Sequence, residues 1–326
     1  MRNLGSQVEI VGICDLNLEQ AKKLASEFGV PNVYTDLSEL LDKQHPGIVD
    51  ICTPPKSHAA IALQCLEAGA NILIEKPMCQ TIEECDEVIA LAGKVGRQIC
   101  IAHSDLFYPS FTKARQIINN GEIGTFRGMH IHLSTPTDYI TSKPDHWAHK
   151  LPGGVFGETG PHVVYMTLAF INPILDAHVI GRKLLDECPW SPYEDYRVSL
   201  VGEKATCTAT MVYATKQWAG TVDLWGTDGS LRIDLQSQCL VHSRREGLRA
   251  IPVGISTIGE MAQVATSAAS TALSYLCGRR TQTHQELLKA FCTSIEQGTA
   301  SPVPADEGRE TIRVMSLLSE QLDGAA

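Results

Sequence analysis

The sequence predicts an α/β protein of two parts: a parallel sheet alternating with helices, then an α+β region built on a mostly antiparallel open sheet. The chain has 326 residues, a length that favours two domains. In its first hundred or so residues, short apolar runs alternate with helical patterns. From Phe126 onward, apolar and polar residues alternate at period two, with short turns between the runs.

The first part is predicted to form a parallel sheet. Helical segments separate its strands, which implies right-handed crossovers. Asn17 caps a helix that ends before Gly29, and a capping box at residues 81–84 opens another helix. The predicted strands are residues 8–14, 48–53, 71–75 and 98–102.

The second part is predicted to form an antiparallel sheet with few helices. One helix is expected at residues 161–171, because Pro161 suits the first helical position, and two more at 285–297 and 307–322. A small-residue helix at 261–276 favours a core position, with a subunit contact as the alternative. The predicted strands are residues 126–134, 196–202, 205–213, 218–225 and 230–235.

Composition excludes several classes of protein. The net charge of −10 without a long basic block argues against a nucleic-acid partner. Eleven cysteines without a Cys-x-x-Cys pair suggest neither a disulfide framework nor a zinc ribbon. No apolar signal segment or membrane span is evident, so we expect a cytoplasmic protein without a membrane partner.

The tripeptide Glu75-Lys76-Pro77 is the most informative motif. It ends the buried strand predicted at residues 71–75, and the carboxyl ends of parallel strands are where α/β sheets bind ligands. A lysine amine exchanges protons near neutral pH when burial or neighbouring charges tune it. Lys76 is therefore a candidate acid or base, although an ordinary surface lysine fits the tripeptide alone.

Four motifs, in order and at the expected intervals, resemble the Gfo/Idh/MocA family of nicotinamide-dependent oxidoreductases. They are Val8-Glu9-Ile10-Val11-Gly12-Ile13-Cys14-Asp15, Cys52-Thr53-Pro54-Pro55 with His58, Glu75-Lys76-Pro77, and Gly153-Gly154 followed by Glu158-Thr159-Gly160-Pro161-His162. The resemblance implies a Rossmann-like dinucleotide-binding domain over residues 1–106 and an α+β substrate and oligomerisation domain over 107–326. It also implies a homo-oligomer, dimer or tetramer, and C-terminal helices that pack back on the first domain.

One part of the family pattern is missing. The family opens with a strand and a Gly-x-Gly-x-x-Gly-like turn that holds the cofactor pyrophosphate, and residues 1–7 resemble instead the end of the helix that follows. We expect either a misplaced start or a truncated relative. The chain as written is expected to bind NAD no more tightly than about millimolar, about 4 kcal/mol.

Asp15 is the candidate for cofactor selection. An acid at the end of this strand accepts hydrogen bonds from the adenosine ribose hydroxyls and repels a 2′-phosphate. Neither Leu16 nor Asn17 is a cation, so NAD is favoured over NADP. Alternatively, Asp15 only caps the following helix alongside Asn17.

The resemblance assigns further residues to the cofactor. Thr53 and Pro54, with Pro55, would line the nicotinamide-ribose side, and Glu75 and Lys76 belong to the same group. His58 lies on the helix behind them, where it is alternatively an ordinary surface histidine.

His162 is the second acid/base candidate. If Pro161 begins a helix, His162 lies in the positive end of the helix dipole, which favours a neutral imidazole able to bind a substrate hydroxyl. Glu158 would tune its charge, although the family usually has aspartate there. By resemblance Lys76 is the principal acid/base, and the reaction is hydride transfer with a secondary hydroxyl or carbonyl of a sugar, sugar derivative or cyclitol. The alternative is a non-catalytic ligand sensor or scaffold.

A polar loop before Gly153 supplies substrate-binding candidates. His146 and Trp147 would offer an aromatic platform for a sugar face. His146 and His149 with Glu158 and His162 are also a conceivable metal set, although we expect no metal. His103 and Tyr108, after a strand end, are weaker substrate-binding candidates.

Overall fold

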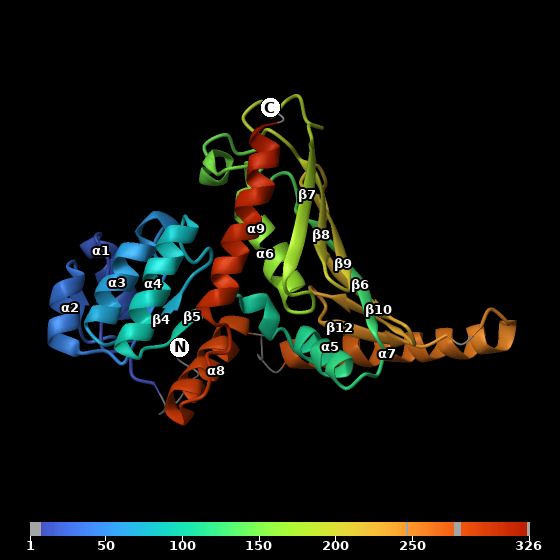
Figure 1. Cartoon of the computed structure of the whole chain (residues 1–326), viewed down its shortest axis with the longest axis horizontal. Helices are drawn as coiled ribbons and strands as arrows, with labels where there is room; N and C mark the ends of the chain where they lie inside the picture. Colours follow the sequence, from blue (N-terminus) through green and yellow to red (C-terminus); the bar gives the residue numbers. More distant parts are fainter. Residues whose placement is uncertain (1–7, 246, 277–281, 325–326) are drawn as a thin grey trace. The chain divides into compact units, whose positions relative to one another are not determined.

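The structure, a computed structural model, describes residues 8–245, 247–276 and 282–324 (Figure 1). The chain divides into two units. Unit 1 runs to Ser104 and includes residues 282–312, whereas unit 2 begins at Asp105 and resumes at Arg313. The prediction for residues 1–7 lies outside the described residues.

Unit 1 contains parallel strands in two separate sheets. One sheet pairs β1 (Ile13–Cys14) with β2 (Val33–Tyr34). The other has the order β3-β4-β5, formed by Ile48–Ile51, Asn71–Ile74 and Ile99–Ile101. The predicted parallel sheet is confirmed, but the strand predicted at residues 8–14 was too long. Only Ile13–Cys14 have a strand partner among the described residues, and a strand exists only where its backbone pairs.

Strand β4 is the centre of the three-stranded sheet. It pairs with β3 on one side and β5 on the other, and all four of its residues are buried. Helices α1 and α4 begin at the predicted caps, where the Asn17 side chain accepts from Gln20 N and Thr81 accepts from Glu84 N, whereas α2 was not predicted and α8 begins two residues before the predicted start. They are α1 (Leu18–Phe28), α2 (Leu37–Gln44), the 3₁₀ turn η2 (Pro55–Ser57), α3 (His58–Glu67), α4 (Ile82–Val95) and α8 (Thr283–Gln297).

Unit 2 contains a seven-stranded sheet of order β12-β11-β10-β6-β9-β8-β7. Its neighbouring strands run antiparallel except β6 and β9, which are parallel, so the prediction of a mostly antiparallel sheet is confirmed. The edge strands β7 and β12 were not predicted. The strands are β6 (Phe126–Ser134), β7 (Ile174–Arg182), β8 (Asp195–Gly202), β9 (Thr206–Val212), β10 (Ala219–Gly226), β11 (Ser230–Asp234) and β12 (Cys239–Ser243).

Helix α6 (Val155–Leu168) packs on this sheet. The rings of Phe156 on α6 and Tyr196 on β8 lie 5.3 Å apart, and both are buried. The later residues of α9 (Ala305–Asp323) lie beside α6 and β7, where Arg313 Nη2 donates to Ile174 O at 2.6 Å (Figure 1). The other helical segments are η3 (Ser104–Phe107), whose first residue belongs to unit 1, and α5 (Pro109–Asn119), η4 (Trp147–Lys150) and α7 (Ala250–Leu276) in unit 2.

Helix α7 corrects one expectation. The small-residue segment at 261–276 was predicted to be a core helix, yet large apolar side chains along α7 face solvent. Within the predicted segment, Met261 is 66% exposed, Val264 48% and Leu273 62%. None of the helices formed by described residues has the length and apolarity needed to cross a membrane.

Candidate active site

Lys76 lies at the carboxyl edge of the three-stranded sheet. It follows Glu75, whose backbone N–H donates to Ile51 O at 3.0 Å and so continues the pairing of β4 with β3. Thr53 and Pro54 leave the end of β3 at the same edge, and both are exposed. The two loops therefore emerge together, because parallel strands end at one edge of a sheet.

His58 joins the two loops. Its ring is fully buried at the start of α3. Nδ1 lies 2.9 Å from Pro77 O and Nε2 lies 2.7 Å from Thr53 O. Both ring nitrogens thus contact backbone carbonyls, and His58 links the loop that contains Thr53 to the loop that contains Pro77.

Glu75 contacts a histidine that the sequence did not single out. His284 Nε2 on α8 lies 3.4 Å from Glu75 Oε1. Burial alone would raise the pKa of Glu75, but the hydrogen bond and charge of His284, with the neighbouring Lys76, lower it overall. The Glu75 carboxylate is therefore held ionised beside Lys76.

Asp15 has a local structural role and still presents a carboxylate oxygen. Its Oδ1 accepts from Asn17 N at 2.7 Å, which is the helix-capping alternative considered above. Its backbone N–H donates to Tyr34 O at 3.1 Å, which fixes Asp15 at the end of β1. Within the described residues Oδ2 has no hydrogen bond, so this oxygen remains available to a ligand.

The helix that carries His162 begins earlier than predicted. Gly153 and Gly154 have φ of 69° and 66°, and the helix follows at Val155, with Pro161 in its interior. The prediction that Pro161 begins the helix was wrong, because two glycines in the left-handed region already turn the chain into it. His162 is therefore well inside α6, and the first helical turn contains Glu158 instead.

His162 is held by two residues of unit 2. Its Nδ1 lies 2.8 Å from Asp105 Oδ2 and 2.6 Å from the Tyr165 hydroxyl, which itself donates to Asp105 Oδ2 at 2.7 Å. The His162 side chain is 28% exposed and that of Asp105 18%. The carboxylate on Nδ1 is thus that of Asp105, whereas Glu158 was the predicted partner.

Comparisons with known proteins agree with this geometry. The model of the oxidoreductase family with an NAD-binding Rossmann fold matches residues 1–103, and the GFO/IDH/MocA C-terminal domain model matches residues 111–232. The chain belongs to the Gfo/Idh/MocA family. Both parts of the fold class predicted from the sequence are those of this family.

Individual Gfo/Idh/MocA relatives are similar over part of their length. The chain is 31% identical to D-glucoside 3-dehydrogenase of Escherichia coli over 119 residues, 36% of this chain and 34% of that protein. It is 28% identical to inositol 2-dehydrogenase of Salmonella paratyphi B over 146 residues, 43% and 44% of the two chains. The chain therefore spans less than half the length of these curated relatives.

A solved Gfo/Idh/MocA structure matches over more of the chain. The WlbA dehydrogenase from Bordetella pertussis, in complex with NADH and UDP-GlcNAcA, superimposes with a TM-score of 0.77. The match covers 98% of this chain and 89% of that one at 15% sequence identity. At that identity, the likeness shows the fold.

The remaining candidates are divided between the two units. His103, in unit 1, is 1% exposed, and Tyr108 precedes α5 in unit 2. Trp147 is 51% exposed and stacks on His146, with the two ring centroids 5.8 Å apart. His149 Nε2 lies 3.3 Å from Ile140 O. No three His, Cys, Asp or Glu side chains of the described residues are grouped so as to hold a metal ion.

The sequence missed Asp105, Tyr165 and His284. Tyr165 lies three residues after His162, a spacing that places two side chains on one helix face, and this signal was available. Asp105 is 57 residues from His162, and His284 is more distant from Glu75 still, so only the tertiary fold reveals these contacts.

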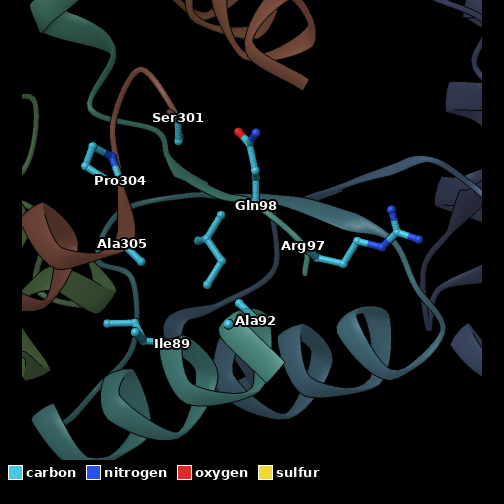
Figure 2. Close-up of a pocket in the computed structure, with 9 residues that line it drawn as sticks. Ile89, Ala92, Arg97, Gln98, Ser301, Pro304 and Ala305 are labelled. Atoms are coloured by element: carbon cyan, nitrogen blue, oxygen red, sulfur yellow. The ribbon is translucent and has the colours of Figure 1, made fainter. Parts of the chain in front are cut away.

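A pocket of about 220 Å³ in unit 1 lies at the amino end of β5 (Figure 2), whereas Lys76 follows the carboxyl end of β4. Gln98 and Ile99 at the start of β5, with Ser301 and Pro304, line it. Arg97 is the charged lining residue, and its guanidinium lies near Gly69. Because ligands of α/β sheets bind at the carboxyl ends of the strands, this pocket is not the candidate site.

Proposed function

We propose that this protein is a NAD(P)-dependent oxidoreductase that transfers a hydride between a nicotinamide cofactor and a secondary hydroxyl or carbonyl of a sugar, sugar derivative or cyclitol. The observation that carries the proposal is the position of Lys76, delivered by the buried strand β4 to the ligand-binding edge of a parallel sheet. Membership of an NAD-binding oxidoreductase family supports it. So do the names of the relatives, a glucoside dehydrogenase and an inositol dehydrogenase.

The residues of unit 1 fit a dinucleotide cofactor. Asp15 would hold the adenosine ribose through its available carboxylate oxygen, and the exposed Thr53 and Pro54, with Pro55, would lie along the nicotinamide ribose. When bound, the nicotinamide supplies the hydride acceptor or donor. The negative charge of Asp15 favours NAD over NADP, since a 2′-phosphate there would meet a like charge.

Proton transfer to and from the substrate is assigned to Lys76 and His162. Oxidation of an alcohol requires a base for the hydroxyl proton, and reduction requires an acid for the carbonyl oxygen. Lys76 is the proposed principal group, next to the ionised Glu75. His162 is proposed to hold a substrate hydroxyl or to relay its proton. His146, Trp147 and His103 stay secondary candidates for substrate binding.

The decisive test is Lys76→Ala in the protein expressed from its complete reading frame. NADH formation would be followed with a D-glucoside, an inositol and UDP-GlcNAcA as probes. Loss of one positioned acid/base group should lower turnover by about a hundredfold or more, and His162→Ala should cost less. Unchanged turnover in Lys76→Ala would remove lysine from the mechanism.

The cofactor preference has its own readout. Fluorescence titration with NADH and NADPH should give tighter binding of NADH, and Asp15→Ala should reduce the difference between the two. Tighter binding of NADPH to the wild type would refute the assignment of Asp15.

We also propose a homo-oligomer in a reducing cytoplasm. Exposed large apolar side chains along α7, and Trp225 of β10 at 40% exposure, support self-association. The described cysteines are free thiols, which is typical of a reducing compartment.

A further inference from the structure

His162 Nδ1 and the two polar groups beside it, the Tyr165 hydroxyl and the Asp105 carboxylate, have few protons to share. The Tyr165 hydroxyl has one proton and donates it to Asp105 Oδ2 at 2.7 Å. The Asp105 carboxylate, when ionised, has none. His162 Nδ1 lies within hydrogen-bond distance of both oxygens, at 2.8 Å and 2.6 Å. A single proton on Nδ1, pointing between the two oxygens, must therefore serve both of these contacts.

The other arrangement of protons is unfavourable. If Tyr165 donated to Nδ1 instead, the Nδ1 lone pair would face Asp105 Oδ2 at 2.8 Å without a proton between them. Two acceptors at that distance repel each other, and the carboxylate would also lose the tyrosine donor. The geometry thus favours a proton on Nδ1.

Burial keeps this arrangement in place. Tyr165 is 1% exposed, and burial, followed by the charge of Asp105 and the hydrogen bond to it, raises the pKa of its hydroxyl well above the ordinary value. Tyr165 therefore stays a donor over the whole working pH range. It lies on α6 with His162, whereas Asp105 comes from η3, so the two partners reach the ring from different elements.

We infer that Asp105 and Tyr165 are positioning residues that hold neutral His162 as the Nδ1–H tautomer, so that Nε2 is the nitrogen that accepts a hydrogen bond from a substrate hydroxyl. No described residue hydrogen-bonds Nε2, and the side chain is 28% exposed, which leaves that nitrogen available. The inference rests on the proposed function for the identity of the ligand, but the tautomer depends only on unit 2. In a neutral imidazole the bond made by one nitrogen determines the role of the other.

The tautomer can be measured directly. Long-range ¹H–¹⁵N correlation spectra of the ¹⁵N-histidine-labelled chain, at a pH where the ring is neutral, show which nitrogen is protonated, and His162→Gln assigns the signal by removing it. We expect the proton on Nδ1 in the wild type. In Asp105→Ala the Tyr165 hydroxyl loses its acceptor and turns to Nδ1, so the proton should move to Nε2. In Tyr165→Phe the proton should stay on Nδ1, because Asp105 remains.

The matched control is Asp176→Ala. Asp176 Oδ2 lies 2.9 Å from His178 Nε2 in the same unit, but both side chains are more than half exposed, at 61% and 63%. This variant should leave the His162 signal and turnover unchanged. Asp105→Ala should lower kcat for the dehydrogenase reaction by about tenfold, less than His162→Ala does, because Asp105 acts on the reaction only through His162.

The two proposals fail in different ways. A wild-type proton on Nε2 would overturn the inference whatever the activity, and so would an Asp105→Ala variant with the wild-type tautomer and the turnover of Asp176→Ala. A wild-type protein that oxidises none of the probe alcohols, yet has its proton on Nδ1, would refute the proposed function and support the positioning of His162.

Discussion

At the scale of single residues, the loops around Lys76 depend on His58. Replacing the buried ring by leucine removes the two nitrogens that lie 2.7 Å from Thr53 O and 2.9 Å from Pro77 O, one of which donates its N–H in a neutral ring. We predict that His58→Leu lowers the free energy of unfolding by about 2 kcal/mol in urea titrations. His178→Leu, at an exposed histidine, should change it by less than about 0.5 kcal/mol. Equal stability of the two variants would contradict the role of His58.

A second residue-scale prediction concerns pH. Burial, opposed in part by the hydrogen bond from Cys52, raises the pKa of Asp50 above its ordinary value of 3.8. Because the folded-state pKa is the higher one, the ionised carboxyl destabilises the fold above that pKa, and this effect disappears below 3.8. Asp50→Asn should therefore have a higher Tm than wild type at neutral pH, and the difference should shrink as the pH falls. A lower Tm at neutral pH would contradict this.

The sequence could locate Lys76 but not Asp105 as a partner of His162. A buried four-residue strand followed by Glu-Lys-Pro predicts where the lysine emerges, since the position depends on local pattern and sheet geometry. Asp105 meets His162 only because η3 and α6 come together in the fold. Contacts between distant segments leave no periodic signal in one sequence.

At the scale of elements, the start of α6 depends on Gly154. Its φ of 66° and ψ of −133° lie in a region that glycine alone adopts readily, and an added Cβ would lie 2.8 Å from Pro192 Cγ. We predict that Gly154→Ala destabilises the protein by about 2 kcal/mol. Gly93→Ala, inside α4 with open space around it, should stabilise by about 0.5 kcal/mol instead. Thermal unfolding of both variants measures the contrast, and the same sign for both would contradict it.

Pro161 was predicted to begin α6 but lies inside this helix. Proline is common at the first helical position, and Pro161 fitted that pattern. Pro161 instead lies inside α6, where it has no N–H to donate to the carbonyl of Gly157, and the two positive-φ glycines before Val155 determine where the helix begins. Strand β7 was not predicted from the sequence, because a bulge between Ile174 and Asp176 breaks its period-two alternation of apolar and polar residues.

At the scale of the whole molecule, the fold class followed from patterns that repeat, while the pairing of strands did not. Alternating helices and apolar runs predicted unit 1, and period-two alternation predicted most of the sheet in unit 2. The parallel pairing of β6 with β9 joins segments far apart in the sequence. The division of the parallel strands into β1-β2 and β3-β4-β5 likewise depends on which backbones meet.

Helix α7 provides the last prediction, on self-association. Its 27 residues expose Ile251, Ile255 and Ile258 by 76%, 67% and 69%, and at positions i, i+4 and i+7 these side chains share one face. A stripe of this kind on a monomer favours burial against a second copy. The double variant Ile255→Asp, Ile258→Asp should therefore sediment as a smaller species than wild type in analytical ultracentrifugation, because charges at a buried contact lack partners. Ser270→Asp, on an exposed polar position of α7, should keep the wild-type mass. An unchanged mass in the double variant would exclude α7 from the interface, and the exposed face of the seven-stranded sheet around Trp225 would then be the surface to test.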